Sequence, residues 1–148
     1  MPEILAPIVR WQPGQLAPDA QQISYRLQKR WKYKSSLPTI VYLATERTVQ
    51  QFGGNFRSQT KVAQVTHDLG LTATWIRYHQ SDRQQAKFWV GEDVFAPSRH
   101  KQKLPDAVML DRNGDPALLV EFGGRYSPER VAAFHSDAER RNIPYHLW

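Results

Sequence analysis

Residues 105–121, with the sequence PDAVMLDRNGDPALLVE, set the fold of this chain of 148 residues. Two apolar runs, at 107–110 and 117–120, flank the dipeptide Asn113-Gly114, and Asn-Gly between two such runs is the strongest short-range signal for a β-hairpin. Each run is apolar on both faces, which is typical of strands in the middle of a covered sheet. The sequence therefore predicts two central antiparallel strands.

The turn also sets which residues of the two strands face each other. If Asn113-Gly114 is the centre of the turn, Asp106 lies opposite Glu121 and both carboxylates project from one face of the sheet. Side chains opposed in this way have Cβ atoms about 4.5–5.5 Å apart, so two carboxylates repel each other unless a cation lies between them. The acid and the proline that follow the turn can lengthen the loop, and a shift of one residue would place the two carboxylates on opposite faces.

A divalent metal ion would supply the cation that this pair needs. Carboxylate oxygens at such a separation suit Mg²⁺ or Mn²⁺, which keep several waters and accept phosphate oxygens of a substrate. Glu92, after a predicted strand at 87–90, is a candidate third ligand, with an ordinary exposed acid at a strand end as the alternative. The alternative for the pair is that Asp106 belongs to a turn and that Glu121 pairs with an arginine such as Arg125.

Further elements extend the hairpin into an α/β fold. Apolar residues at steps of three and four predict a helix over residues 60–79, in which Gly70 costs about 1 kcal/mol relative to Ala and requires a packing partner. A strand at 87–90 follows. After the hairpin, an N-cap and first-turn pattern predicts a last helix, and residues 145–148 form a terminal strand. Residues 59–148 are therefore expected to form an α-β-β-β-α-β core.

Residues 1–58 are expected to form a basic N-terminal arm. Asp19 can cap a helix, and a β-hairpin with strands at 31–34 and 39–43 follows it. A brief helix at 46–52 comes next. A helix followed by a basic hairpin resembles the second half of a winged helix.

Positive charge is concentrated before residue 106. The chain has 20 Lys and Arg against 14 Asp and Glu, and its formal charge is +6. The densest basic cluster is interleaved with aromatic residues and comprises Arg26, Lys29, Arg30, Lys32 and Lys34, and a later basic loop contributes Lys101 and Lys103. Cations interleaved with aromatic rings suit the phosphates and sugar faces of nucleic acid, so DNA is the first partner to consider. The alternative is a solvated helix face followed by a basic strand.

Composition excludes or disfavours several classes of protein. Without cysteine, the chain can have no disulfide, thiolate zinc site, iron–sulfur cluster or cysteine nucleophile. It has no P-loop, GxGxxG or GxSxG motif, so we expect no nucleotide cofactor. No apolar run is long enough to cross a bilayer and the N-terminus lacks a signal-peptide pattern, so we expect a cytoplasmic protein that does not enter a membrane.

The residues around the hairpin resemble those of the PD-(D/E)XK nuclease superfamily. Pro105-Asp106, Glu121 beyond the hairpin and a following helix match its motif, and its core has the same α-β-β-β-α-β order. A likeness to replication-relaxation-type proteins of plasmids and integrative elements covers residues 60–148 and includes His67-Asp68-Leu69, Trp89, Gly91-Glu92 and the segment 121–148. The resemblance implies a restriction-endonuclease-like core preceded by a partial winged helix, in a protein that acts on DNA and pairs with itself or with a replication or mobilisation partner.

The resemblance also implies roles for individual residues. Asp106 and Glu121 would be catalytic metal ligands that position a water for attack on a phosphodiester. The superfamily places a lysine two residues after the second carboxylate, where this chain has Gly123. The candidates to replace that charge are Arg125, on the same nominal face, and Lys101 or Lys103, in the preceding loop. Retention of both acids favours a metal-dependent nuclease, whereas the glycine favours an inactive nuclease fold that binds DNA or a replication partner.

Overall fold

The computed structural model describes residues 6–32, 40–52, 62–95 and 104–148. Within these ranges the strands are β1 (Val9–Trp11), β2 (Trp89–Gly91), β3 (Ala107–Leu110), β4 (Pro116–Glu121) and β5 (Tyr145–Leu147). The helices are α1 (Ala20–Lys32), α2 (Glu46–Phe52), α3 (Val62–Ser81), α4 (Arg83–Ala86), α5 (Glu92–Phe95) and α6 (Pro128–Arg141). Among these described helices, none combines the length and the hydropathy needed to cross a membrane.

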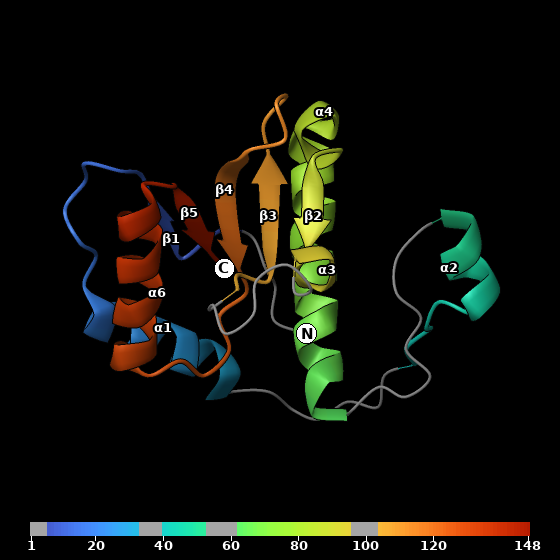
Figure 1. Cartoon of the computed structure of the whole chain (residues 1–148). Helices are drawn as coiled ribbons and strands as arrows, with labels where there is room; N and C mark the ends of the chain where they lie inside the picture. Colours follow the sequence, from blue (N-terminus) through green and yellow to red (C-terminus); the bar gives the residue numbers. More distant parts are fainter. Residues whose placement is uncertain (1–5, 33–39, 53–61, 96–103) are drawn as a thin grey trace.

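The five described strands form one mixed sheet in the order β1-β5-β4-β3-β2 (Figure 1). Strands β2, β3 and β4 form an antiparallel meander, β5 lies parallel to β4, and β1 pairs antiparallel with β5. The parallel pair needs a crossover, which α6 provides. The α/β class is confirmed, and from α3 onward the order of elements is the predicted one apart from the one-turn helices α4 and α5.

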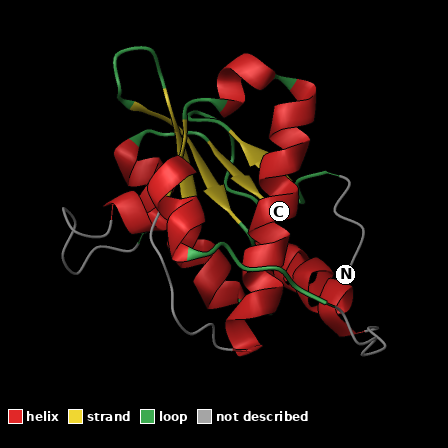
Figure 2. Ribbon diagram, turned by 90° about the vertical axis from the view of Figure 1, so that its right-hand side faces the viewer, coloured by secondary structure: helices red, strands yellow, loops and turns green. Residues whose placement is uncertain are grey.

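Helices cover both faces of the sheet (Figure 2). One cluster of buried residues joins α1 and α6 to the sheet through Leu27, Phe134 and Leu119. A second cluster joins α3 to the other face through Tyr78 and Val120. Because successive residues of a strand point to opposite faces, neighbouring residues of β4 enter different clusters, and this explains why residues 117–120 are apolar on both faces.

The β3–β4 hairpin has the predicted register but a different turn. Asp111 N–H donates to Asp115 O at 2.8 Å, so these residues close a three-residue loop, and Gly114 within it has a φ of 88°. The prediction of a two-residue turn centred on Asn113-Gly114 is therefore wrong. The longer loop shifts the pairing of β3 with β4 by one residue next to the loop. An irregularity between Met109 and Leu110 then shifts the pairing back, so the rest of the two strands pairs as predicted. As predicted, Val108 faces Leu119.

Strand β1 and helix α1 belong to the same core as the rest of the sheet. Asp19 caps α1, as predicted, because its Oδ1 accepts hydrogen bonds from two backbone N–H groups of the first turn at 2.9 and 3.0 Å. Leu27 of α1 is completely buried, and Trp11 of β1 is 3% exposed in the same cluster. Residues expected in a separate arm therefore cover one face of the sheet.

The hairpin predicted after α1 is wrong where the structure describes it. Trp31 and Lys32 belong to α1, and residues 40–43 form no strand. Helix α1 continues because Trp31 packs edge-on against Phe122, with ring centroids 5.8 Å apart. Residues 33–39 of the same prediction lie outside the described residues. The described part of the chain thus lacks the strands that a winged helix requires at this place, although α2 has the predicted bounds.

Gly70 has the packing partner that a glycine in the middle of a helix requires. It is buried on α3, and a Cβ at this position would lie 2.1 Å from Phe122 Cζ. The Phe122 ring therefore occupies the space that an alanine methyl group would need. This close contact brings α3 against the end of β4.

Candidate active site

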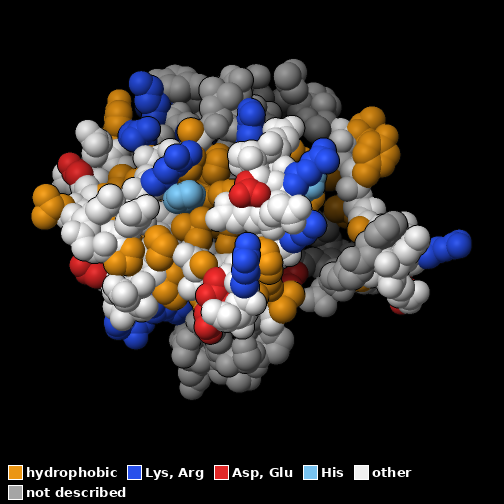
Figure 3. Space-filling model, turned by 90° about the horizontal axis from the view of Figure 1, so that it is seen from above, with side chains coloured by type: hydrophobic (Ala, Val, Ile, Leu, Met, Phe, Trp, Pro, Cys, Tyr) orange, Lys and Arg blue, Asp and Glu red, His pale blue; other side chains and the backbone are white. Residues whose placement is uncertain are grey.

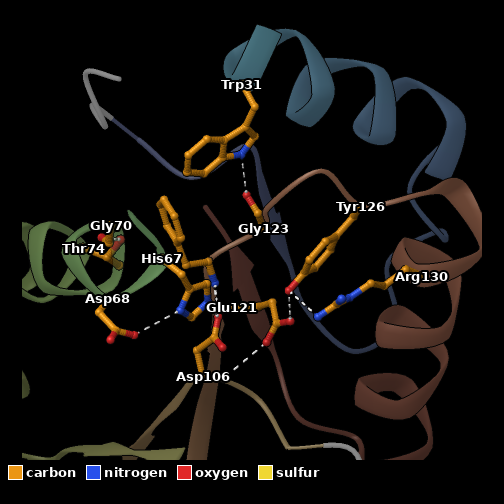
Figure 4. A network of polar contacts seen from close by, with 11 residues as sticks. Trp31, His67, Asp68, Gly70, Thr74, Asp106, Glu121, Gly123, Tyr126 and Arg130 are labelled. Carbon is orange, nitrogen blue, oxygen red and sulfur yellow. Dashed lines mark hydrogen bonds and ion pairs between the residues drawn. The ribbon is translucent and has the colours of Figure 1, made fainter. Parts of the chain in front are cut away.

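Asp106 and Glu121 lie side by side where β3 begins and β4 ends (Figure 4). The backbone N–H of Asp106 donates to Glu121 Oε2 at 3.2 Å, and the N–H of Phe122 donates to Asp106 Oδ2 at 2.7 Å. Each carboxylate thus accepts a hydrogen bond from a backbone N–H at or next to the other acid. The structure brings the two predicted acids together, as the register of the hairpin requires.

Glu121 is almost completely buried, with 3% of its surface exposed. The Tyr126 hydroxyl donates to Glu121 Oε1 at 2.5 Å, and Arg130 Nη2 donates to the Tyr126 oxygen at 3.0 Å. Burial, followed by the charge of Asp106, raises the pKa of Glu121 to about 7. Burial and the neighbouring charge of Asp106 thus both favour the protonated form of Glu121.

Tyr126 connects Glu121 with the positive charge of Arg130. The guanidinium carbon of Arg130 lies 3.8 Å from the centroid of the Tyr126 ring, which is the geometry of a cation–π contact. Burial and the charge of Glu121 raise the pKa of Tyr126, so its hydroxyl keeps its proton and donates. The orientation of Glu121 is thus fixed by a buried hydrogen bond to a tyrosine.

His67 of α3 faces Asp106 from the other side of the pair. Its Nε2 lies 3.1 Å from Asp106 Oδ2, and its Nδ1 lies 3.6 Å from Asp68 Oδ1. The hydrogen bond to Asp106 is the main cause that raises the pKa of His67. The side chains of His67 and Asp68 are 31% and 40% exposed, against 12% for Asp106. The partly exposed side of the acid pair is therefore the α3 side.

Helix α1 closes the position at which the superfamily has its lysine. Trp31 Nε1 donates to Gly123 O at 3.2 Å. A Cβ on Gly123 would lie 2.6 Å from Leu27 Cδ2 and 3.2 Å from Leu147 Cδ1. The close approach of α1 therefore requires glycine here, and a lysine side chain has no room.

Arg125, expected to supply the missing charge, contacts α1 instead of the acids. Its Nη2 donates to Trp31 O in the last turn of α1 at 3.4 Å, and its side chain is exposed. The basic groups that the structure places next to the acids are His67, which contacts Asp106, and Arg130, which reaches Glu121 through the tyrosine. The sequence predicts neither of them as a site residue.

Glu92 lies beside Asp106 on the neighbouring strand, at the start of α5, with an exposed side chain. Its N–H donates to Asp106 O at 3.0 Å, which extends the β2–β3 pairing by one residue. The Glu92 backbone is thus next to that of Asp106 just beyond the end of β2, and Asp106 is next to Glu121 at the end of β4. Among the described residues, however, no three or more His, Cys, Asp or Glu side chains are grouped to hold a metal ion. The structure therefore brings together two of the three predicted ligands.

The predicted DNA contacts on α1 are partly exposed. The side chains that reach solvent are those of Arg26, Lys29 and Lys32. Arg30 is half-buried, and burial, followed by the charge of Arg26, lowers its pKa. The remaining predicted contacts, Lys34, Lys101 and Lys103, lie outside the described residues. One helix thus offers three exposed cations to an anionic partner.

No family model, curated protein or solved structure matches this chain. The function of the acid pair is therefore inferred from its geometry and its chemistry.

Proposed function

We propose that this chain is a divalent-metal-dependent phosphodiesterase that cleaves DNA with a nuclease-like core. The observation that carries the proposal is the adjacency of Asp106 and Glu121, joined by a hydrogen bond of 3.2 Å from the backbone of one acid to the carboxylate of the other. Two carboxylates close enough for one to raise the pKa of the other attract a cation. The likeness to plasmid replication-relaxation proteins supports DNA as the substrate.

Asp106 and Glu121 would hold the metal ion. Mg²⁺ is commonly bound by one or two protein carboxylates, with waters and substrate phosphates in its remaining positions, so two acids suffice. A bound cation would also displace the proton that burial and repulsion favour on Glu121. The ion would supply a Lewis acid for the phosphate and lower the pKa of a bound water.

The surrounding side chains would orient the acids and balance charge. Tyr126 holds the Glu121 carboxylate in one orientation. His67 has a raised pKa because of Asp106 and is partly exposed, so the positive charge of its protonated form would attract a substrate phosphate on the α3 side. The exposed cations of α1 would neutralise phosphates of the duplex.

Cleavage of supercoiled plasmid tests the proposal. The protein is incubated with plasmid and Mg²⁺ or Mn²⁺, and nicked and linear products are separated on a gel. Asp106→Asn and Glu121→Gln keep the shape of each side chain and are expected to abolish cleavage. Asp115→Asn, in the exposed hairpin loop, is the matched control and is expected to cleave normally. Cleavage that persists in both site variants, or that needs no metal ion, contradicts the proposal.

The second candidate is a protein that binds DNA, a replication or mobilisation partner, or a second copy of itself without cleaving DNA. The packing of Leu27 against Gly123 favours it, because this contact leaves no place for the superfamily's lysine. Retardation of the plasmid without cleavage, unchanged in Asp106→Asn, would identify a DNA-binding protein.

A further inference from the structure

A second candidate site lies between β1, β5 and the C-terminal half of α3. A cavity of about 360 Å³ is lined there by basic and aromatic side chains, including Arg10, Arg77, Tyr78, His146 and Trp148. None of the described residues that line it is acidic. Its volume falls in the range of small-molecule sites, roughly 300–1,000 Å³. Because Arg77 follows His67 by ten residues on α3, about 15 Å of helix separates the cavity from the acid pair.

Arg10 gives this cavity a positive charge. The β1–β5 ladder pairs Arg10 with His146, so the two side chains lie next to each other on one face of the sheet edge. The charge of Arg10 also acts on Tyr78: burial raises the pKa of the tyrosine to about 12, and Arg10 opposes this rise. Within the described part of the chain, Arg10 forms no ion pair. Seen from above, the molecule presents several separate Lys and Arg side chains among hydrophobic and uncharged ones (Figure 3).

Hydrogen bonds join three aromatic side chains that line the cavity. Trp148 Nε1 donates to the Tyr78 oxygen at 3.2 Å, and an indole N–H can only donate. Tyr78 also forms a short hydrogen bond with His146 Nδ1 and a stacked ring contact with the same histidine. Burial, followed by the charge of Arg10, lowers the pKa of His146 to about 4, so this ring is neutral at neutral pH.

We propose that this cavity binds a phosphate monoester carried by a nucleotide or by the 5′ end of a nucleic-acid strand. Guanidinium groups bind phosphate oxygens through paired N–H donors, and two arginines line the cavity. The electrostatic attraction to two cations is stronger for a doubly charged phosphate monoester than for a singly charged diester. Tyr78 and Trp148 form the floor of the cavity, where each leaves a small part of its surface, 8% and 5%, for the rest of the ligand to contact. The site does not depend on hydrolysis by the acid pair.

The test compares probes that differ only in the phosphate. Adenosine 5′-monophosphate and adenosine are titrated into the protein by calorimetry at physiological ionic strength, and the monophosphate is expected to bind at least about tenfold more tightly. Arg10→Gln and Arg77→Gln are each expected to weaken its binding by about tenfold. The matched control, Arg83→Gln, removes an exposed arginine of α4 and is expected to bind normally. Equal affinity for the two probes, or an equal loss in the control, would overturn the proposal.

Two further comparisons identify the source of the phosphate and separate this site from the acid pair. Preference for a 5′-phosphorylated oligonucleotide over its 5′-hydroxyl form assigns the cavity to strand ends, and preference confined to the monophosphate assigns it to nucleotides. Arg10→Lys keeps the charge without the paired donors and is expected to bind with intermediate affinity, which provides a second variant if Arg10→Gln does not fold. Asp106→Asn is expected to bind the monophosphate normally even where plasmid cleavage is lost or absent.

Discussion

The two sides of the acid pair differ in how tightly they are packed. On the side of α1 and α6, Glu121 is buried beside Tyr126, and Gly123 lies so close to α1 that even a methyl group would not fit. On the α3 side, His67 contacts Asp106 and still leaves 31% of its own side chain exposed. The closed side therefore fixes the shape of the pair, and the open side gives access to it. Substitutions on the closed side should reduce stability, whereas those on the open side should reduce activity.

The largest effect is expected when a lysine is introduced at position 123, where the nuclease motif would have one. Gly123→Lys would place a Cβ 2.6 Å from Leu27 Cδ2, so α1 must move or the end of β4 must distort. Overpacking costs about 1–3 kcal/mol and a buried ammonium adds to it, so we expect the free energy of unfolding to fall by at least about 3 kcal/mol. Urea unfolding measures the change.

The neighbouring glycine provides the control for this prediction. A Cβ on Gly124 would have Tyr126 Cε1 as its nearest neighbour among the described residues, at 3.8 Å, which is an ordinary contact. Gly124→Lys is therefore expected to be nearly as stable as the wild type. If Gly123→Lys unfolded at the same urea concentration as Gly124→Lys, the closed side would not be rigid.

A smaller loss of stability is expected from Tyr126→Phe. The change removes the hydroxyl that donates to Glu121 Oε1 and leaves a buried carboxyl without this donor. Such a loss typically costs about 1–3 kcal/mol, so we expect the free energy of unfolding to fall by about 2 kcal/mol. Tyr25→Phe, on the exposed surface of α1, should change it by less than about 0.5 kcal/mol. Equal stabilities of the two variants would contradict a structural role for the buried hydrogen bond.

The stability of the protein should depend on pH because Glu121 is buried. Because the pKa of Glu121 is raised in the folded state, the folded protein binds this proton more tightly than the unfolded chain does. The resulting stabilisation is fully present below the ordinary glutamate pKa and is lost as the pH rises to about 7. The pKa of His67 is also raised, so its contribution to stability is likewise lost as the pH rises above the ordinary histidine pKa.

Unfolding measured from about pH 5 to pH 8 should therefore show lower stability at higher pH, by an amount on the order of 1 kcal/mol. Glu121→Gln removes the titrating group and should flatten the part of this slope below pH 7. A slope that is identical in the variant and the wild type would show that another group titrates.

The smallest effect on stability is expected from His67→Gln, on the open side. Partly exposed ion pairs contribute about 0–1 kcal/mol, so we expect a change below about 1 kcal/mol. Under the proposed function, plasmid cleavage should nevertheless fall by at least about tenfold, because the imidazole faces the substrate. His79→Gln on the same helix is the control and should cleave normally. A destabilisation as large as that of Tyr126→Phe would remove the contrast between the two sides.

The adjacency of the two acids could be predicted, although the turn that produces it could not. Asn113-Gly114 indicates a reversal of the chain but does not fix the length of the loop. The observed loop is one residue longer than predicted, and the irregularity in the ladder restores the original pairing before Asp106 meets Glu121. A change in the loop alone would have placed the acids on opposite faces.

The N-terminal elements depend on contacts that the local sequence does not reveal. Strand β1 has three residues, too few for an alternating pattern to identify. The alternation of basic and aromatic residues after residue 30 suggested a strand, but Trp31 remains helical because its indole bonds to Gly123, 92 positions away. Packing against a distant segment here overrides local preference.

The side chains around the acids could be predicted to different degrees. Tyr126 and Arg130 are four positions apart at the start of a predicted helix, close in sequence to Glu121, so a local pattern was present. His67 lies 39 positions from Asp106, and the packing of α3 on the sheet, which includes the contact of Gly70 with Phe122, brings its helix to the acids. No pattern of residue spacing in the sequence predicts a contact between residues this far apart.

The contact of α1 with the sheet means that residues 59–148 do not form an independent module. A fragment that begins at residue 59 would expose to water the apolar surfaces of Leu119 and Tyr145, which Leu27 and Trp11 now help to bury. Such a fragment would tend to aggregate, and grafting it onto a foreign N-terminal segment would leave the same surfaces uncovered. The two parts of the sequence must therefore be inherited and engineered as one unit.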